Sequence, residues 1–157
     1  MEKKAFRVFL DSNVIISGLF SDKGSPRIIL DILCLTLPFL TGITGQYNIV
    51  EIERNLTKKM PEIFPIYREY FKKLNLEVIP LPSYETVKQF FGHTSEKDAP
   101  VLASAVTGNA DFLVTGDKKD FSKAREISPF EILSPAEFLN TIVPEIIEFI
   151  KKPDAAD

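Results

Sequence analysis

The amino-acid sequence predicts an α/β fold, a three-layer α/β/α sandwich with a mainly parallel central sheet. Short apolar runs alternate along the chain with stretches in which apolar residues recur at helical spacing. Turn residues separate the two kinds of segment. An order of strand, helix, strand is typical of β-α-β units, whose strands run parallel.

Apolar runs bounded by turn residues are predicted strands. The first, Phe6 to Leu10, is interrupted by Arg7 and ends at Asp11. The predicted strands span residues 6–10, 38–43, 78–81 and 111–115, and residues 127–133 hold a last short strand.

Helical spacing and capping residues mark the predicted helices. One begins at Ser25-Pro26, because Ser can cap a helix and Pro suits its first position. The last, 135–152, begins after Ser134, with Glu137 placed to complete a capping box and a bend predicted at Pro144. Between them, helices are predicted from residue 49 to before Pro61, at 63–74, from Ser83 through Phe90, and from Ser95 to near Gly108.

Length and composition favour one cytoplasmic domain over residues 1–157. The apolar runs are shorter than the roughly 18 residues that span a bilayer, and the N-terminus lacks the pattern of a signal peptide. The single cysteine, Cys34, excludes an internal disulfide and a cysteine-based zinc site. A reducing, cytoplasmic location without a membrane partner is therefore expected.

The charge balance excludes one class of partner. The chain has 19 basic and 22 acidic residues, a net charge of −3. Broad binding to duplex DNA requires many cations to replace counterions, so the sequence argues against it. A nucleic-acid enzyme stays possible, because acids gathered around metal ions leave the remaining surface nearly neutral.

Acidic residues from distant segments are expected to meet at one edge of the sheet. Asp11 and Asp117 each follow a predicted strand, and parallel strands end at the same edge, where open α/β folds bind ligands. Asp98 and Glu51 lie early in predicted helices, which begin near that edge. Glu53, two residues further along the same predicted helix, is an alternative to Glu51 as the fourth acid of this cluster.

Such a cluster requires cations. Two carboxylates about 5 Å apart repel by roughly 3 kcal/mol at an effective dielectric of 20. Oxygen ligands with almost no Cys or His favour Mg²⁺ or Mn²⁺ over Zn²⁺. The chemistry predicted from the cluster is metal-assisted hydrolysis of a phosphodiester.

Motifs in sequential order resemble the PIN domain family, over about residues 6–139. They are Val8-Phe9-Leu10-Asp11-Ser12-Asn13 and its continuation to Ser17, Glu51 to Leu56, Lys97 to Ala105, Phe112 to Phe121, and a tail from Ile132 to Leu139. The segment before Glu51 departs most from the family pattern, because residues 41–45 are rich in glycine.

The resemblance implies a Mg²⁺- or Mn²⁺-dependent endonuclease acting on single-stranded RNA. Its catalytic and metal-binding acids map onto Asp11, Glu51, Asp98 and Asp117, with Asp120 as a further acid near the metals and Asn13 and Thr115 as polar supports. The resemblance also implies a toxin that a partner antitoxin neutralises, and a homo-oligomer, most simply a dimer.

Other readings of the same residues remain open. Asp117 could be only a turn residue, and Asp98 could only stabilise a helix N-terminus. The basic stretch Lys118, Lys119, Lys123 and Arg125 is either a solvated surface or a rail for RNA phosphates.

Two rival functions share parts of this pattern. A haloacid-dehalogenase-like phosphatase would need a second acid at position 13, where this chain has Asn13. A catalytically silent PIN-like module that binds RNA or protein is the main alternative, although all four acids are present.

The C-terminal segment suggests a contact surface. Large apolar residues crowd residues 142–150 more densely than one buried helix face requires. One interpretation is an interface with a second copy or an antitoxin. The other is that a bend at Pro144 brings both faces to the core.

Overall fold

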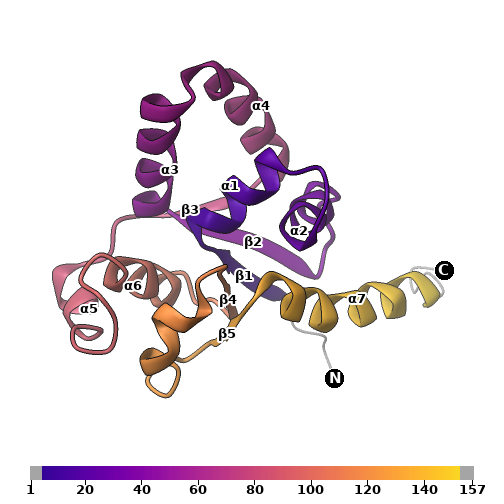
Figure 1. Cartoon of the computed structure of the whole chain (residues 1–157). Coiled ribbons are helices and arrows are strands. Elements are labelled where there is room, and N and C mark those ends of the chain that lie inside the picture. Colours follow the sequence, from indigo (N-terminus) through magenta and orange to yellow (C-terminus); the bar gives the residue numbers. More distant parts are fainter. Residues whose placement is uncertain (1–4, 153–157) are drawn as a thin grey trace.

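A computed structural model describes residues 5–152 of the chain, and its centre is a five-stranded, all-parallel sheet (Figure 1). The strands are β1 (Phe6–Leu10), β2 (Leu40–Gly45), β3 (Glu77–Ile79), β4 (Phe112–Val114) and β5 (Glu131–Leu133), in the order β3-β2-β1-β4-β5. The predicted α/β sandwich with a parallel sheet is confirmed.

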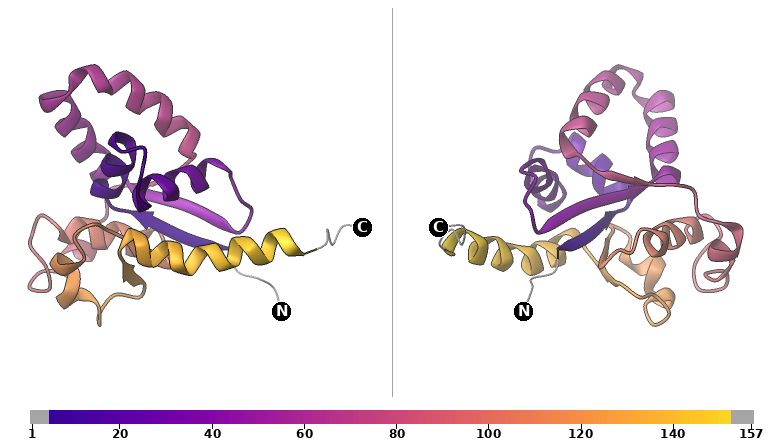
Figure 2. Two further views of the ribbon diagram at one scale, coloured as in Figure 1. Left: turned by 45° about the vertical axis from the view of Figure 1, so that its right-hand side comes forward. Right: turned by 180° about the vertical axis from the view of Figure 1, so that it is seen from behind.

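Helices cover both faces of this sheet (Figure 2). The helices are α1 (Ser12–Phe20), α2 (Ser25–Cys34), α3 (Gln46–Lys59), α4 (Phe64–Leu74), α5 (Tyr84–Lys88), α6 (Ala99–Thr107) and α7 (Pro135–Lys151). Two 3₁₀ segments, η1 (Pro61–Ile63) and η2 (Lys118–Ala124), precede α4 and follow β4. None of the helices in the described part of the chain has both the length and the apolar character needed to cross a lipid bilayer.

The side chains of each strand point alternately to the two faces of the sheet, and this divides the core into two layers. Val8 and Leu10 of β1 pack with α1, α2, α3, α4 and α7, whereas Phe9 packs on the other face with α5, α6 and η2. Successive strand residues point to opposite faces, and both faces are buried. The first half of α7 belongs to the core, because Phe138 and Ile142 are fully buried.

The helix α1 was not predicted. Its residues 14–16 are consecutive apolar residues with no single helical stripe, so spacing gave no signal. The helix begins because Asp11 caps it, its carboxylate accepting the backbone N–H of Ser12.

A predicted helix boundary is corrected. The helix α6 begins at Ala99 rather than Ser95, because residues 96–98 form a turn that Ser95 caps through the N–H of Asp98. The last strand, Glu131–Leu133, is the short strand predicted within residues 127–133. The helix α7 runs on through Pro144 to Lys151, and its predicted capping box between Ser134 and Glu137 is present.

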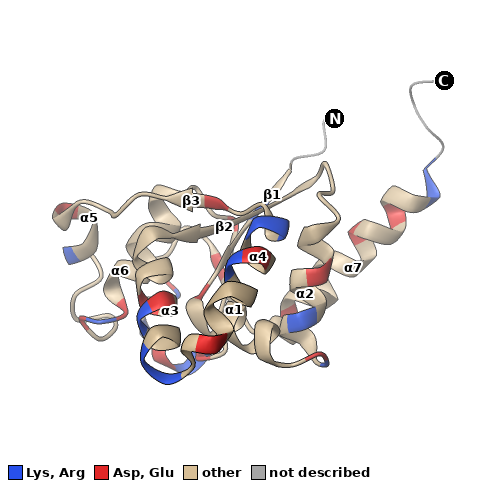
Figure 3. Cartoon of the chain, turned by 90° about the horizontal axis from the view of Figure 1, so that it is seen from above, with Lys and Arg blue, Asp and Glu red and all other residues tan. Residues whose placement is uncertain are grey.

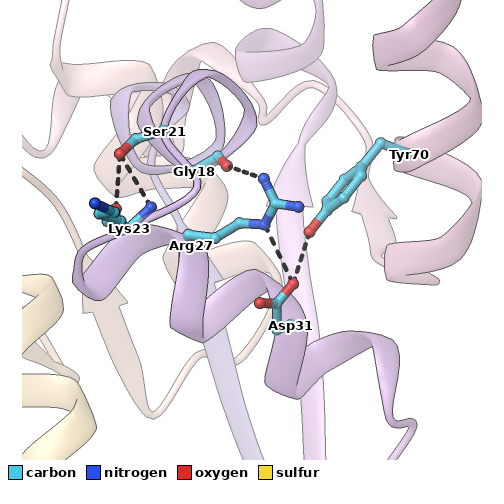
Figure 4. Close-up of polar contacts among 6 residues, drawn as sticks. All are labelled: Gly18, Ser21, Lys23, Arg27, Asp31 and Tyr70. Carbon is cyan, nitrogen blue, oxygen red and sulfur yellow. Dashed lines mark hydrogen bonds and ion pairs between the residues drawn. The ribbon is translucent and has the colours of Figure 1, made fainter.

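Polar contacts join α2 to α1 and α4 (Figure 4). The Arg27 guanidinium donates to the Gly18 carbonyl and to Asp31, and it lies 5.2 Å from the centre of the Tyr70 ring. Tyr70 donates to the same Asp31 oxygen at 3.1 Å. Burial, reinforced by this bond, raises the pKa of Tyr70 to about 12. These contacts hold the α3–α4 hairpin beside α1 and α2.

The strand order locates a ligand-binding edge. From β1 the chain continues to β2 and β3 on one side, and β4 and β5 lie on the other, so the order reverses between β1 and β4. Ligands of open α/β sheets bind at such a reversal, outside the carboxyl ends of the strands. Leu10 pairs with Val114, which places Asp11 and Thr115 side by side at this edge.

Candidate active site

A cavity of about 160 Å³ lies at the carboxyl edge of β1 and β4. Residues from β-strand ends, helices and η2 line it, although they are far apart in the sequence. All five acids singled out in the sequence are among them: Asp11, Glu51, Asp98, Asp117 and Asp120. The cavity wall also includes Ser12, Asn13, Ile16, Asn55, Lys97 and Val101.

Asp11 is the most buried of these acids, with 7% of its surface exposed. One oxygen, Oδ1, accepts the Ser12 N–H at 2.8 Å and the Asn48 side-chain amide at 3.3 Å. The other, Oδ2, accepts the Thr115 hydroxyl at 2.8 Å. Donors from α1, from α3 and from the residue that follows β4 therefore fix the orientation of this carboxylate.

Burial raises the pKa of Asp11 to about 6 from its ordinary value of 3.8. Hydrogen bonds from Thr115 and Ser12 oppose this shift, and the nearby charges of Glu51 and Asp98 add to it. The carboxylates therefore interact electrostatically across the cavity, as expected for a cluster that a cation would stabilise.

Asn13 links the first turn of α1 to the loop after β4. Its amide nitrogen donates to Asp117 Oδ2 at 2.9 Å, and its oxygen accepts the Gly116 N–H at 2.9 Å. The Asp117 N–H in turn donates to the Thr115 hydroxyl. Thr115, fully buried, thus connects Asp117 to Asp11 through one oxygen atom. Both predicted supports contact the acids.

The two candidates for the acid on α3 occupy different places. Glu51 lines the cavity and accepts the Ser12 hydroxyl at 2.7 Å. Glu53 accepts the hydroxyl of Tyr67 on α4 at 3.1 Å and is not among the cavity residues. The geometry therefore favours Glu51.

Asn48 is a site residue that the sequence analysis missed. It is fully buried one turn before Glu51, and its amide donates to Asp11 and to the Ser12 hydroxyl. Its Oδ1 has no hydrogen-bond partner among the described residues. Gly45 allows this close packing, because a Cβ there would lie 2.9 Å from that oxygen. The signal available in the sequence was the spacing: Asn48 lies four residues before Ile52 and eight before Leu56, on the apolar face of the helix.

Asp98 and Asp120 complete the acidic wall. Asp98 is the residue before α6, and its Oδ2 accepts the Ser95 hydroxyl at 2.9 Å. Asp120 lies in η2, and its N–H donates to the Asp117 carbonyl. None of the five acids has an ion pair with another described residue. Their charge is therefore not neutralised within the described chain.

The predicted basic residues lie in different surroundings. Lys118 binds both oxygens of Glu137 at 2.8 and 2.9 Å, away from the acids. This contact, with the Ser134 N–H, lowers the pKa of Glu137 to about 2. Lys119 and Lys123 line a neighbouring cavity, and Arg125 lies apart from both cavities. Lys97, which was not among the predicted basic residues, lines the acidic cavity.

The donor set fits a hard divalent cation in its chemistry. The cavity presents carboxylate oxygens, and the orphaned amide oxygen of Asn48 lies behind them. Within residues 5–152, no group of three or more His, Cys, Asp or Glu side chains stands close enough together to chelate an ion as arranged. Binding would thus require the acidic side chains to close on the ion.

Comparison with known structures gives matches to this fold. VapBC2 from Rickettsia felis bound to a DNA fragment from their promoter matches with a TM-score of 0.59 at 19% identity, over 82% of this chain and 97% of that chain. VapBC-1 from nontypeable Haemophilus influenzae matches with a TM-score of 0.59 at 16% identity, over 83% and 99%. FitAcB from Neisseria gonorrhoeae matches with a TM-score of 0.60 at 16% identity, over 82% and 97%. At these identities the likeness shows the fold alone.

Sequence comparison identifies the family. No curated protein sequence matches. The family model described as PIN domain matches residues 7–119, which is well over half of the chain and includes every residue that lines the acidic cavity except Asp120. The chain therefore belongs to the PIN domain family.

Proposed function

We propose that this chain is a Mg²⁺- or Mn²⁺-dependent endoribonuclease that hydrolyses phosphodiester bonds of single-stranded RNA. The observation that carries the proposal is the convergence of five carboxylates on one cavity at the switch point of the sheet. Structural carboxylates are normally paired, whereas these have no ion pair among the described residues. Membership of the PIN domain family supports it.

The acids Asp11, Glu51, Asp98 and Asp117 would hold the cation, with Asp120 beside them. A bound Mg²⁺ or Mn²⁺ supplies positive charge and Lewis acidity to a phosphodiester. Neighbouring residues keep the acids in place: Ser12 holds Glu51, and Thr115 holds Asp11. Lys97, on the cavity wall, offers a positive charge to a substrate phosphate.

An antitoxin partner is the second part of the proposal. The similar structures include VapBC and FitAcB assemblies, and the family resemblance associates small PIN proteins with antitoxins. We infer that a neutralising protein covers the acidic cavity of this chain. Co-expression with the product of an adjacent small gene, followed by co-purification and loss of cleavage, tests this inference.

A homodimer is proposed at the outer end of α7, which extends beyond the rest of the fold (Figure 3). Ile147 and Ile150 are 45% and 73% exposed there, beside the exposed Val143 and Phe149. Apolar surface of this kind is typical of an interface. In sedimentation, Ile147→Glu with Ile150→Glu is expected to give monomers, whereas Leu81→Glu, at an exposed apolar site elsewhere, leaves a dimer intact. A wild-type protein that is already monomeric contradicts the dimer.

The enzymatic proposal is tested by cleavage of single-stranded RNA with Mg²⁺, Mn²⁺ or EDTA. Cleavage is expected with either ion and not with EDTA. Glu51→Gln should reduce the rate at least about 100-fold, whereas Glu53→Gln, the same change two residues along α3, should retain it. Specific RNA binding without cleavage under any condition would instead support the silent binding module.

A further inference from the structure

A second cavity, of about 270 Å³, adjoins the acidic one. It is lined by residues 92–95 before α6 and by Lys119, Asp120, Ser122 and Lys123 of η2, and we call it the basic cavity. Asp120 lines both cavities. We propose that the basic cavity binds the phosphate and ribose of an RNA nucleotide next to the cleaved bond. This proposal rests on the proposed ribonuclease function.

The charge of the basic cavity fits an anion. Lys119 and Lys123 have no ion-pair partner within the described chain, unlike Lys118, which Glu137 binds. His93 adds a third nitrogen group to the wall. Asp120 is the single acid among the lining residues, and it stands at the boundary with the acidic cavity. Two free ammonium groups facing one cavity favour a phosphate.

The walls of the basic cavity are held together before any ligand binds. The Thr94 hydroxyl donates to the Asp120 carbonyl at 2.9 Å, which joins the turn before α6 to η2. Phe121 anchors η2 in the core with 1% of its surface exposed. Gly92 adopts a φ of 85°, which glycine accommodates without strain. A preformed cavity binds with a smaller loss of conformational entropy.

Neighbouring aromatic residues favour a nucleotide over a free anion. Phe91 precedes Gly92 and bridges through its backbone to Thr94, and both of these neighbours line the basic cavity. Its ring contacts that of Tyr84 with centroids 6.1 Å apart, and both rings are exposed. Exposed aromatic rings stack unpaired RNA bases. In this proposal a single strand runs from the acidic cavity to the basic cavity, which share Asp120, and its bases stack on the ring pair.

His93 provides a direct probe, because it is the only histidine in the sequence. In the untagged protein with EDTA, its imidazole C–H resonance is followed while adenosine 5′-monophosphate or inorganic phosphate is added. The resonance is expected to shift saturably, with tighter binding of the nucleotide. Lys119→Gln with Lys123→Gln should weaken nucleotide binding about tenfold or more, because two charge-assisted contacts are lost.

The matched control is Lys151→Gln with Lys152→Gln, which makes the same charge change at the far end of α7 (Figure 1). It should change nucleotide affinity less than about twofold, since distant surface charges are screened. With metal present, the Lys119/Lys123 variant should raise KM for single-stranded RNA about tenfold and leave kcat within about twofold.

The outcomes separate this proposal from the enzymatic one. If the protein cleaves RNA but the His93 resonance does not respond, or the two double variants behave alike, the basic cavity is not a nucleotide site. If inorganic phosphate binds as tightly as the nucleotide and KM is unchanged, the cavity holds a free anion and the assignment is wrong. If His93 reports tighter nucleotide binding but no RNA is cleaved, the nucleotide site stands and the ribonuclease proposal fails.

Discussion

The hydroxyl of Thr115 joins the carboxyl ends of β4 and β1 by donating to Asp11 Oδ2 at 2.8 Å. Leu10 and Val114 pair in register, so the residues that follow them meet at the carboxyl edge. The same hydroxyl accepts the Asp117 N–H at 3.0 Å. One fully buried side chain therefore holds two of the proposed metal-binding acids.

Thr115→Val tests this relationship. The hydrogen bond from Thr115 lowers the pKa of Asp11, so its loss should raise that pKa further above its ordinary value. Cleavage is expected to fall about tenfold near pH 6.5 and less at pH 8.5, because one hydrogen bond to a charge is worth about 1.5 kcal/mol. Thr115→Ser should restore the wild-type pH profile. A uniform loss at every pH would indicate a purely structural role.

Much of the fold and site could be predicted from sequence because both depend on local patterns. Apolar runs marked β1 and β4, and an acid after each strand marked the edge. Asn48 was missed because a helical polar residue normally faces solvent, and its place in the apolar stripe of Ile52 and Leu56 is a weak signal. Its burial and its hydrogen bonds to Asp11 and Ser12 are visible only in the structure. Lys118 and Lys119 are adjacent in sequence, but their side chains have different surroundings. Glu137 on α7 binds Lys118, whereas Lys119 lines the basic cavity.

The stability of the metal-free protein should depend on pH through Asp11. Its pKa in the folded protein is raised to about 6 from 3.8, so the folded state favours the protonated acid. The stabilisation is full below about pH 4 and is lost as pH rises through 6, by up to about 3 kcal/mol.

Asp11→Asn removes this titration while keeping the shape of the side chain. In urea unfolding with EDTA, the variant should gain stability relative to the wild type between pH 4.5 and 7.5. The comparison is made at equal ionic strength, with Asp22→Asn in an exposed loop as the control. A variant that loses stability relative to the wild type over this range would contradict the raised pKa.

Divalent ions should stabilise the wild-type fold. An ion at about 100 times its Kd adds about 2.7 kcal/mol, which corresponds to a rise in Tm of about 5–10 °C for a chain of this size. Millimolar Mn²⁺ should produce this shift at pH 7.5 and a smaller one at pH 5, where protons compete for Asp11. Asp117→Asn should reduce the shift. An equal shift in that variant would place the ion elsewhere.

The most direct measurement is the rate of single-stranded RNA cleavage by Asp11→Asn with saturating Mn²⁺, under single-turnover conditions. Loss of charge at the centre of the acidic cavity should slow cleavage at least about 1,000-fold, a loss of about 4 kcal/mol of transition-state stabilisation. Asp22→Asn should cleave at the wild-type rate. Folding of Asp11→Asn is verified by circular dichroism and by a cooperative melt. Cleavage by a folded Asp11→Asn protein at the wild-type rate would contradict the assignment of the acidic cavity as the nuclease site.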